Sequence, residues 1–338
     1  MSALPKPSMQ TSSRDDAVQL NRAFKGLGCD TAVVVNVLGN RNASQRDSIQ
    51  QEYETLFSDD LKKQLALELH GHLKKAVLLW MKSPVERDVT TLRQALTGPI
   101  IDIKTATEII CTRISSQIRQ IKQVYTPTFG TLLEYDIGYH TSGDHRKRAL
   151  SFTVNEIMRL VLKVDYFLHV VRKYPDTTRY DGPEIERVLV EEDAIAISKI
   201  EVKKSGMDES TFIQIFTERS SAHLAALASA YHTMFRKELR KTIKRETSGN
   251  FKYALLTILE YAVDPTKHYA TMLRKAMKGL GTDDSTLIRI LATRAEIDLQ
   301  KIKEDYLKRY KRPLVEVVHS DTSGYYRAFL LSLLGSKF

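Results

Sequence analysis

The sequence predicts an all-α protein that consists of four copies of one helical unit. Three observations lead to this prediction: a recurring arginine–tyrosine pair, apolar residues at helical spacing around it, and a lack of strand signals. Each of four arginines is followed twelve residues later by a tyrosine, and the pairs are Arg41 and Tyr53, Arg113 and Tyr125, Arg219 and Tyr231, and Arg294 and Tyr306. The same coincidence in four places indicates an internal repeat.

Apolar residues lie seven, four and three positions before each arginine and eight positions after it. This spacing is typical of the buried stripes of amphipathic helices. Alternating β-branched runs with Asn-Gly turns, which would indicate strands, are essentially missing. The positions predicted to be buried are Val34, Val37, Leu38 and Ile49, then Ala106, Ile109, Ile110 and Ile121, then Phe212, Ile215, Phe216 and Leu227, and finally Leu287, Ile290, Leu291 and Ile302.

The second half of each unit is expected to add a short helix and a longer one, which gives five helices in about 70 residues. An arginine at the same place in every copy is expected to donate hydrogen bonds to carbonyl groups at helix ends. The repeated tyrosines, Cys111 and Trp80 are expected to lie in the core. The short segments are Asp60–Leu69, Lys237–Glu246 and Pro313–Ser320, and the longer ones are Leu73–Met81, Phe251–Ala262 and Tyr325–Leu334.

The spacing of the arginines predicts the domain organisation, because successive arginines lie 72, 106 and 75 residues apart. The wider middle interval indicates an extra connector, in which Tyr174–Pro183 carries the turn residues. The predicted parts are a short N-terminal tail (1–13), repeat 1 (14–84), repeat 2 (85–161), a linker (162–183), repeat 3 (184–262) and repeat 4 (263–338).

Composition narrows the class of protein. Hydrophobic residues make up 42% of the chain and charged residues 27%, which is the balance of a globular protein. Lys and Arg number 51 against 41 Asp and Glu, and the resulting charge of +10 suits an anionic membrane surface or nucleic acid, although it also serves solubility. Two cysteines make no disulfide framework, so a reducing compartment is expected. The N-terminus lacks an apolar signal segment and no apolar run could span a bilayer, so we expect a cytoplasmic protein with at most peripheral membrane contact.

Two loops carry the candidate chemistry. Gly28 and Gly281 each lie thirteen residues before a repeat arginine, and each is the second glycine of a Gly-x-Gly sequence. Forty residues beyond them stand two carboxylates, Glu68 and Asp321. Calcium takes six to eight oxygen ligands at roughly 2.3–2.6 Å, and glycine lets backbone carbonyl groups turn towards one point. The alternative is that each Gly-x-Gly only ends one helix before the next helix is capped.

A single carboxylate would leave a bound calcium ion with positive charge and open coordination positions. Few charged ligands predict weak intrinsic affinity, on the order of 10⁻⁵ M or worse. A phosphate or carboxylate of a lipid headgroup could complete the coordination shell, so that calcium and lipid would each raise the affinity for the other. The pattern therefore predicts a metal bridge to an acidic membrane.

The combination of K-G-L-G-T-D, then T-R, then a tyrosine, then D-T-S-G resembles the annexin repeat. The resemblance covers nearly all of the chain, from Asp15 to Gly335, and repeat 4 matches best. AEIDLQKIKEDYLKRY and SGYYRAFLLSLLG resemble plant annexins in particular. The resemblance implies four repeats of five helices in a curved, disc-like array, with calcium loops on the convex face that lies against acidic phospholipid such as phosphatidylserine.

The same resemblance implies which residues bind calcium and lipid. In each outer repeat three backbone carbonyl groups and one carboxylate would hold Ca²⁺, and a lysine of the loop would contact headgroup phosphates. These residues are the carbonyl groups of Phe24, Gly26 and Gly28 with the carboxylate of Glu68, the carbonyl groups of Met277, Gly279 and Gly281 with the carboxylate of Asp321, and the lysines Lys25 and Lys278.

The middle repeats depart from this pattern. Repeat 2 has Gly98 without a second glycine, and His140 at the acid position, so no calcium is expected there. Repeat 3 keeps one glycine, Gly206, and the acid, Glu246, so that its calcium binding is left open. Cys29 replaces the usual threonine in repeat 1, where an inert thiol is expected and oxidation that tunes calcium binding is the alternative.

An enzyme is the main alternative class. The chain has no Walker A, H-E-x-x-H or G-x-S-x-G motif, which disfavours a nucleotide hydrolase. Peroxidase-like activity is linked to some plant annexins through a histidine beside the first repeat arginine, but Asn40 stands here. His70 and His72 near Glu68 could bind a transition metal, although an exposed polar loop is the simpler interpretation. We therefore expect no enzymatic activity.

A calcium-independent helical scaffold that binds protein or RNA is the other alternative. Ile288-Arg289-Ile290 resembles a short motif linked to actin binding in plant annexins, which makes a cytoskeletal partner an option. We expect no nucleic-acid partner, a monomer in solution, and membrane association when calcium rises; self-association on the membrane is left open.

Overall fold

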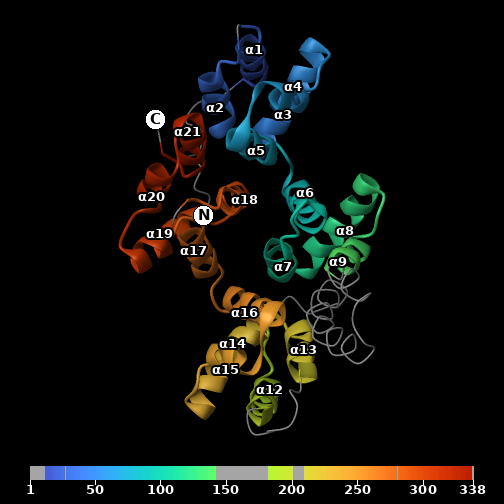
Figure 1. Ribbon diagram of the computed structural model, residues 1–338, viewed down its shortest axis with the longest axis vertical. Helices are drawn as coiled ribbons and strands as arrows, with labels where there is room; N and C mark the ends of the chain where they lie inside the picture. Colours follow the sequence, from blue (N-terminus) through green and yellow to red (C-terminus); the bar gives the residue numbers. More distant parts are fainter. Residues whose placement is uncertain (1–11, 27, 142–181, 201–208, 280, 337–338) are drawn as a thin grey trace, which may run out of the picture. The chain divides into compact units, whose positions relative to one another are not determined.

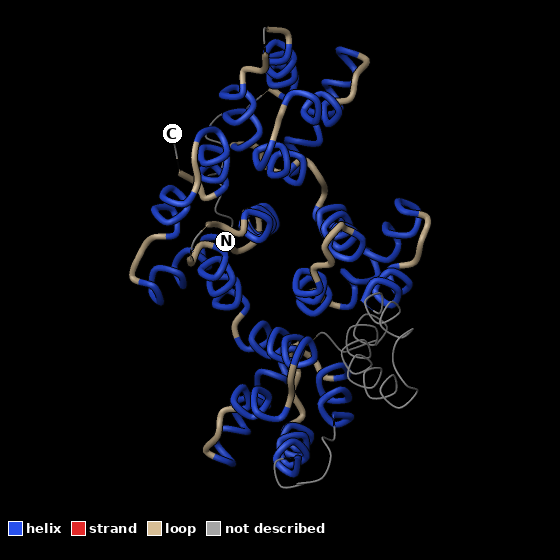
Figure 2. Tube along the Cα trace, viewed as in Figure 1, coloured by secondary structure: helices blue, strands red, loops and turns tan. Residues whose placement is uncertain are grey.

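The computed structural model describes residues 12–26, 28–141, 182–200, 209–279 and 281–336. Every regular element in these ranges is an α-helix, as the sequence predicts, and Figures 1 and 2 show no strand in them. The predicted linker lies outside the described residues except at its last two positions. The structure comprises two compact units, residues 1–87 with 266–338 and residues 88–265. The curved array that the resemblance implies stays a prediction.

The first unit contains the helices of repeats 1 and 4, with five helices in each. The longer last helices, α5 and α21, pack against each other, and α5 also packs against α18. Repeat 1 has α1 (Ser13–Phe24), α2 (Thr31–Gly39), α3 (Ala43–Phe57), α4 (Leu61–Glu68) and α5 (Gly71–Trp80), and repeat 4 has α17 (Pro265–Ala276), α18 (Asp284–Arg294), α19 (Leu299–Tyr310), α20 (Leu314–Asp321) and α21 (Gly324–Leu333).

The second unit contains the helices of repeats 2 and 3. Helix α16 packs against both α7 and α14, so that the last helix of repeat 3 joins the two repeats. The described residues of repeat 2 hold α6 (Pro84–Thr97), α7 (Ile103–Thr112), α8 (Ser115–Phe129) and α9 (Leu133–Thr141), and those of repeat 3 hold α12 (Arg187–Ile200), α13 (Glu209–Glu218), α14 (Ser221–Phe235), α15 (Leu239–Glu246) and α16 (Gly249–Val263).

The core consists of the stripes that the sequence predicts. All sixteen apolar positions around the repeat arginines are at most 4% exposed, and the four repeat tyrosines at most 2%. Trp80 and Cys111 are buried as well, which confirms them as core residues. Apolar side chains at these spacings leave water together when the helices pack, and that burial is the main force that holds each unit together.

The prediction for the repeat arginines is wrong about their main hydrogen-bond partner. Three of them bind a buried aspartate on the first helix of their own repeat, and Arg41 donates only a longer bond, of 3.4 Å, to the carbonyl group of Asn40 at the end of α2. Repeat 4 has no aspartate at that place, and Arg294 instead lies 4.7 Å from the ring centroid of Tyr269 and pairs with Asp298 at 2.6 Å. The aspartate pairs, with their shortest N–O distances, are Arg41 and Asp16 at 2.6 Å, Arg113 and Asp88 at 2.6 Å, and Arg219 and Asp193 at 2.7 Å.

The aspartate of repeat 3 predicts a pH dependence of stability. Asp193 is 6% exposed and also lies 2.9 Å from Nε2 of His223. Burial opposes its ionisation, but the hydrogen bonds from His223 and Arg219 outweigh burial and lower the pKa of Asp193. Because the folded pKa lies below the unfolded one, ionised Asp193 stabilises the fold above about pH 4, and this stabilisation is lost as the pH falls through the folded pKa.

We therefore expect Asp193→Asn to lower the free energy of unfolding by about 2 kcal/mol at neutral pH, since it leaves Arg219 without its counter-charge. Urea unfolding followed by circular dichroism at pH 7 and at about pH 2.5, below the ordinary pKa of an aspartate, would measure the effect. The difference between the variant and the parent should shrink at the lower pH. An unchanged difference would mean that ionisation of Asp193 does not stabilise the fold.

Candidate metal centres

The loop between α1 and α2 is closed by one residue, Asp30. Its N–H group donates to the carbonyl group of Ala23 at 2.9 Å, and its carboxylate caps α2 by accepting from the N–H group of Val33 at 3.2 Å. The loop between α17 and α18 is closed in the same way, because Asp283 donates to Ala276 at 2.8 Å and caps α18. The described residues between Ala23 and Asp30, and those between Ala276 and Asp283, thus form two loops that are closed in the same way.

The second glycine of each loop has nearly the same backbone conformation. The φ angle is 93° at Gly28 and 91° at Gly281, and Gly279 has a φ of 124°. A Cβ built on any of these three would meet no atom within 4 Å, so the conformation rather than lack of space requires glycine. Gly26 does not have a positive φ; there a Cβ would lie 3.3 Å from the carbonyl oxygen of Gly28.

Each loop lies beside the end of the helix that carries its carboxylate. In repeat 4 the hydroxyl group of Thr282 donates to the carbonyl oxygen of Asp321 at 3.4 Å. In repeat 1 the charge of Glu68 acts on the thiol of Cys29, which directly follows Gly28. Glu68 and Asp321 are the last residues of α4 and α20, and both are partly exposed. The fold therefore brings together residues that lie 39 positions apart in the sequence, Thr282 with Asp321 and Cys29 with Glu68.

The remaining predicted site residues differ in their exposure. Lys25 and Lys278 are exposed, and the Nζ atom of Lys25 lies 6.0 Å from the ring centroid of Phe57. The side chain of Met277 is only 6% exposed, and the ring of Phe24 lies edge-on to Tyr53. Phe24 and Met277 can therefore serve a metal only through their backbone oxygens.

We call each glycine loop together with its carboxylate a corner: residues 24–28 with Glu68 in repeat 1, and residues 277–281 with Asp321 in repeat 4. The two corners are linked inside the first unit. His72 on α5 lies 3.4 Å from a carboxylate oxygen of Asp284, and its ring centroid lies 5.6 Å from that of Tyr326. The hydroxyl group of Tyr326 donates to Asp284 at 2.8 Å. Burial, followed by the neighbouring carboxylate of Asp284, raises the pKa of Tyr326, so the phenol stays protonated. His72 follows Glu68 by four residues, and Tyr326 follows Asp321 by five, so these contacts join the two corners.

Repeat 2 keeps the loop closure but not the glycine conformation. Asp102 donates to Ala95 at 2.8 Å and caps α7, as its counterparts do in the outer repeats. Gly98 has no positive φ, and a Cβ there would lie 2.5 Å from a backbone oxygen of Gln94. The side chain of His140 lies outside the described residues. The loop of repeat 2 therefore lacks the backbone that distinguishes the outer loops.

Repeat 3 differs at its carboxylate. Glu246 ends α15 as predicted, but the Nε atom of Arg245 donates to its carboxylate at 2.6 Å. Gly206 and the rest of its loop lie outside the described residues. Sequence reasoning named Glu246 as a metal ligand candidate and overlooked Arg245, although the adjacent opposite charge was visible in the sequence.

Two other candidates receive structural explanations. Burial, helped by the charges of Glu68 and Asp30, raises the pKa of the Cys29 thiol against the opposing hydrogen bond with Thr31, which favours an inert thiol. Nδ1 of His70 lies 3.1 Å from the carbonyl oxygen of Glu68, so His70 and His72 have different partners. Within the described ranges no group of three or more His, Cys, Asp or Glu side chains could hold a metal ion.

The structure also shows where the residues behind the cytoskeletal and peroxidase alternatives lie. Ile288, Arg289 and Ile290 are at most 5% exposed within α18, so they do not form a surface for a cytoskeletal partner. The side-chain amide of Asn40 donates to the carbonyl oxygen of Asn36 at 2.8 Å and acts as a local cap. In the described part of the chain no helix is both long and apolar enough to cross a bilayer.

Comparison with known proteins decides the family. The annexin family model matches residues 15–80, 87–151, 193–258 and 268–333. The chain is an annexin. It is 52% identical to annexin D5 of Arabidopsis thaliana over 335 residues, which are 99% of both chains. The solved structure of chicken annexin V has a TM-score of 0.85 at 32% identity and covers 99% of both chains. A calcium-bound annexin (Sm)1 has a TM-score of 0.80 at 25% identity and covers 100% of this chain and 94% of its own.

These comparisons confirm the all-α annexin fold with four repeats and the resemblance to plant annexins. They also support calcium as the metal of this annexin and the family role in calcium-dependent phospholipid binding. The residues that hold the ion in this annexin, and the exact limits of its repeats, stay predictions.

Proposed function

We propose that this annexin binds acidic phospholipid membranes through calcium ions held at two corners, one in repeat 1 and one in repeat 4. The observation that carries the proposal is that each positive-φ glycine loop lies beside the end of a helix of the same repeat, at the residue that bears the carboxylate. The residues that would hold the ions are the backbone oxygens of Phe24, Gly26, Gly28, Met277, Gly279 and Gly281 and the carboxylates of Glu68 and Asp321.

The donor set suits calcium. Calcium accepts neutral backbone oxygens together with carboxylates, whereas transition metals favour imidazole and thiolate ligands. With one carboxylate for each ion, a corner keeps a net charge of +1 and attracts an anionic headgroup. Lipid oxygens that complete the shell would couple lipid binding to calcium binding, because each ligand raises the affinity for the other.

The surroundings of the corners also suit a lipid interface. Lys25 and Lys278 are exposed beside the glycines and could contact phosphate groups. Leu67, directly before Glu68, is 69% exposed, and Tyr325, four residues after Asp321, is 52% exposed. Apolar and amphipathic side chains next to a charged contact are typical of proteins that lie on a membrane surface.

Cosedimentation with vesicles that contain phosphatidylserine tests the proposal. At physiological ionic strength, where charge attraction over distance is screened, the protein should pellet with calcium and return to the supernatant with chelator. Vesicles of phosphatidylcholine alone serve as the control. Pelleting that does not depend on calcium and is lost when salt is added would instead favour a calcium-independent scaffold that binds through its basic surface.

The exposed leucine gives a further prediction. Leu67→Asn should lower the affinity for vesicles in calcium by roughly three- to tenfold, because burying a leucine side chain is worth about 1.5–3 kcal/mol and insertion here would be partial. Vesicle titration would measure the change. Leu307→Asn is the matched control, since Leu307 on α19 is 46% exposed and is neither in a glycine loop nor next to Glu68 or Asp321. Equal losses in both variants would argue against insertion of Leu67.

A further inference from the structure

The corner after the fourth helix has the same backbone in repeats 1, 3 and 4. The carboxylates Glu68, Glu246 and Asp321 each end a short helix, and the next helix starts three residues later at a glycine. The φ angles of these glycines are 60°, 58° and 57°, and the preceding residue is extended in each case. Repeat 3 therefore presents its acid on the same local scaffold as the two candidate calcium corners.

The residue before the acid differs between the repeats. It is Leu67 in repeat 1 and Ser320 in repeat 4, neither of which carries a charge, but Arg245 in repeat 3. The 2.6 Å bond from Nε of Arg245 places a guanidinium group on the carboxylate of Glu246. The Arg245 side chain is 55% exposed, whereas that of Glu246 is 20% exposed. The acid of repeat 3 thus already has a cation, and that cation faces solvent.

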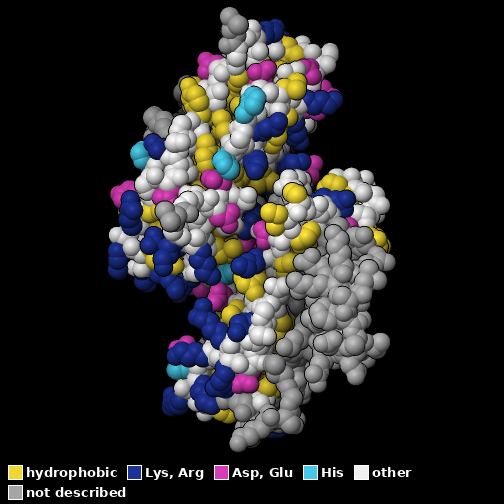
Figure 3. Space-filling view, in the orientation of Figure 1, with side chains coloured by type: hydrophobic (Ala, Val, Ile, Leu, Met, Phe, Trp, Pro, Cys, Tyr) yellow, Lys and Arg dark blue, Asp and Glu magenta, His cyan; other side chains and the backbone are white. Residues whose placement is uncertain are grey.

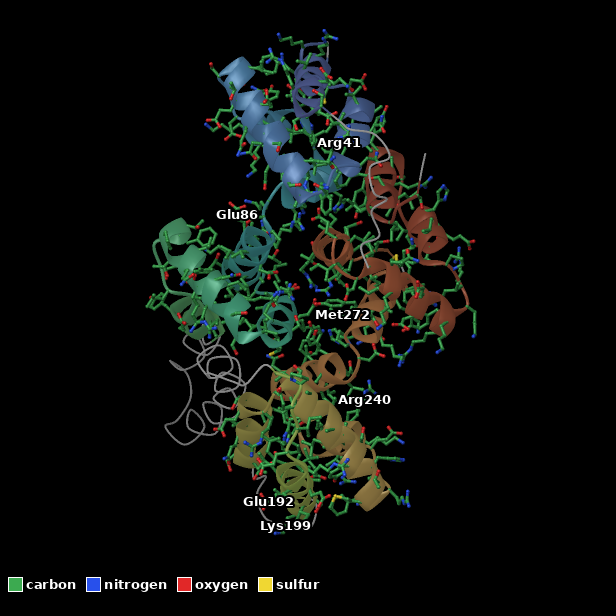
Figure 4. All side chains as sticks on the ribbon, turned by 180° about the vertical axis from the view of Figure 1, so that it is seen from behind. Arg41, Glu86, Glu192, Lys199, Arg240 and Met272 are labelled. Carbon is green, nitrogen blue, oxygen red and sulfur yellow. The ribbon has the colours of Figure 1, made fainter. Side chains whose placement is uncertain are left out.

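The neighbours of Arg245 add to this positive charge. Lys244 is exposed next to it, while Leu239 and Ile243 turn the other side of α15 into the core. Two more basic residues of α15 have acidic partners, because Arg240 lies 2.7 Å from Glu260 and Lys241 lies 3.3 Å from Glu238. Figure 3 shows Lys and Arg side chains gathered over α15, and Figure 4 labels Arg240 on this helix.

This corner is positively charged, as a calcium corner would be. Lys244 and Arg245 with Glu246 give +1, and one Ca²⁺ ion with one carboxylate gives +1 before the loop lysine, Lys25 or Lys278, is counted. The guanidinium group presents N–H donors in a planar fork that matches two oxygens of a phosphate group. Its bond to Glu246 uses Nε, so the carboxylate helps to orient the exposed guanidinium group.

We propose that Arg245 and Lys244 replace calcium in repeat 3, so that this corner binds the phosphate of an acidic lipid headgroup directly, without a metal ion. The inference rests on the proposed function, because it assigns a second kind of membrane contact to a third corner of the same design. Repeat 3 would then hold the protein weakly at an acidic membrane at low calcium, and the calcium corners would add affinity when calcium rises.

The test uses the full chain with phosphatidylserine vesicles in chelator at moderate salt. Lys244→Gln with Arg245→Gln should lower the affinity roughly ten- to thirtyfold, because each basic residue near an acidic surface adds about fivefold. The matched control is Lys301→Gln with Lys308→Gln, which removes the same charge from exposed positions of α19. Excess inorganic phosphate should compete only weakly, since it lacks the surrounding membrane charge.

Replacing Glu246 separates the inference from a calcium site in repeat 3. Glu246→Gln should leave binding in chelator unchanged or stronger, and should leave the calcium-induced gain intact. A calcium-induced gain that falls in Glu246→Gln would make repeat 3 a calcium corner and overturn the inference. Equal losses of affinity in the Lys244 and Arg245 variant and in the Lys301 and Lys308 variant would overturn it as well, because binding would then follow overall charge. So would tighter binding to single-stranded RNA than to vesicles.

Failure of the proposed function would look different. In that case calcium would not raise the affinity of the parent protein for vesicles, whether or not Lys244→Gln with Arg245→Gln lowers binding in chelator. An effect of Lys244→Gln with Arg245→Gln in chelator, without any gain from calcium, would keep the direct contact and reject the calcium bridges.

Discussion

Glu68→Gln combined with Asp321→Asn is expected to remove the calcium-dependent binding of acidic vesicles, with a loss of about a hundredfold or more in affinity. Each substitution replaces the only carboxylate of one corner and leaves neutral oxygens that hold calcium poorly. The contacts of His72 with Asp284 and Tyr326 join the two corners within one unit, so one membrane can engage both. Two linked contacts bind far more tightly than either alone, and each single variant should therefore already lose much of the affinity.

The measurement is vesicle titration across a range of free calcium at physiological ionic strength. Glu54→Gln with Glu316→Gln is the matched control, because it removes the same two charges from exposed positions, one of them on the helix that carries Asp321. Circular dichroism should show an intact fold in both double variants. If the Glu68 and Asp321 variant kept the calcium response of the control, the assigned corners would be wrong.

Glu296→Gln is expected to cause the largest loss of stability, about 3 kcal/mol or more. Glu296 accepts hydrogen bonds from Arg46 at 3.1 and 3.2 Å and from the N–H group of Ala43 at 2.6 Å, and a nitrogen of Arg87 lies 3.6 Å away. Both arginines are 2% exposed, and their guanidinium carbons lie 3.7 and 4.7 Å from the ring centroid of Trp80. Removing the carboxylate would leave two buried positive charges around one ring, which is far costlier than losing a surface pair.

Urea unfolding measures this loss, and Trp80 reports it directly because it is the only tryptophan of the chain. Glu238→Gln is the control, since its pair with Lys241 is largely exposed and should change the free energy of unfolding by about 0.5 kcal/mol or less. A similar small effect for Glu296→Gln would mean that the arginines are solvated in solution and that the junction of repeats 1 and 4 is looser than it looks.

Helix positions and core residues followed from the sequence because burial repeats with the helical period. Val34, Val37 and Leu38, for example, share one face of α2 whatever the rest of the chain does. The partners of the arginines did not follow. Asp16 lies 25 residues before Arg41 on another helix, and periodicity shows that a residue is buried without showing which residue it meets.

For the candidate site, too, the sequence predicted the residue types and their spacing but not the side-chain contacts. Fixed spacing pointed to Gly28, Gly281 and the two distant acids, because glycine and carboxylate are demanded by backbone conformation and by charge. The bond between Arg245 and Glu246 depends on the side-chain conformation of two adjacent residues, which spacing does not determine. The burial of Ile288-Arg289-Ile290 likewise requires the packing of α18 against α5.

The link from α5 to α18 and α21 sets how sharply this annexin would respond to calcium. Because one unit holds both outer corners, a firm hold on the bilayer would need two weakly bound ions at once. The membrane-bound fraction would then rise with nearly the square of the calcium concentration at low occupancy, which corresponds to a Hill coefficient approaching two. A modest, steady calcium level would leave the protein at most weakly held at the membrane, whereas a brief calcium peak would bind it firmly.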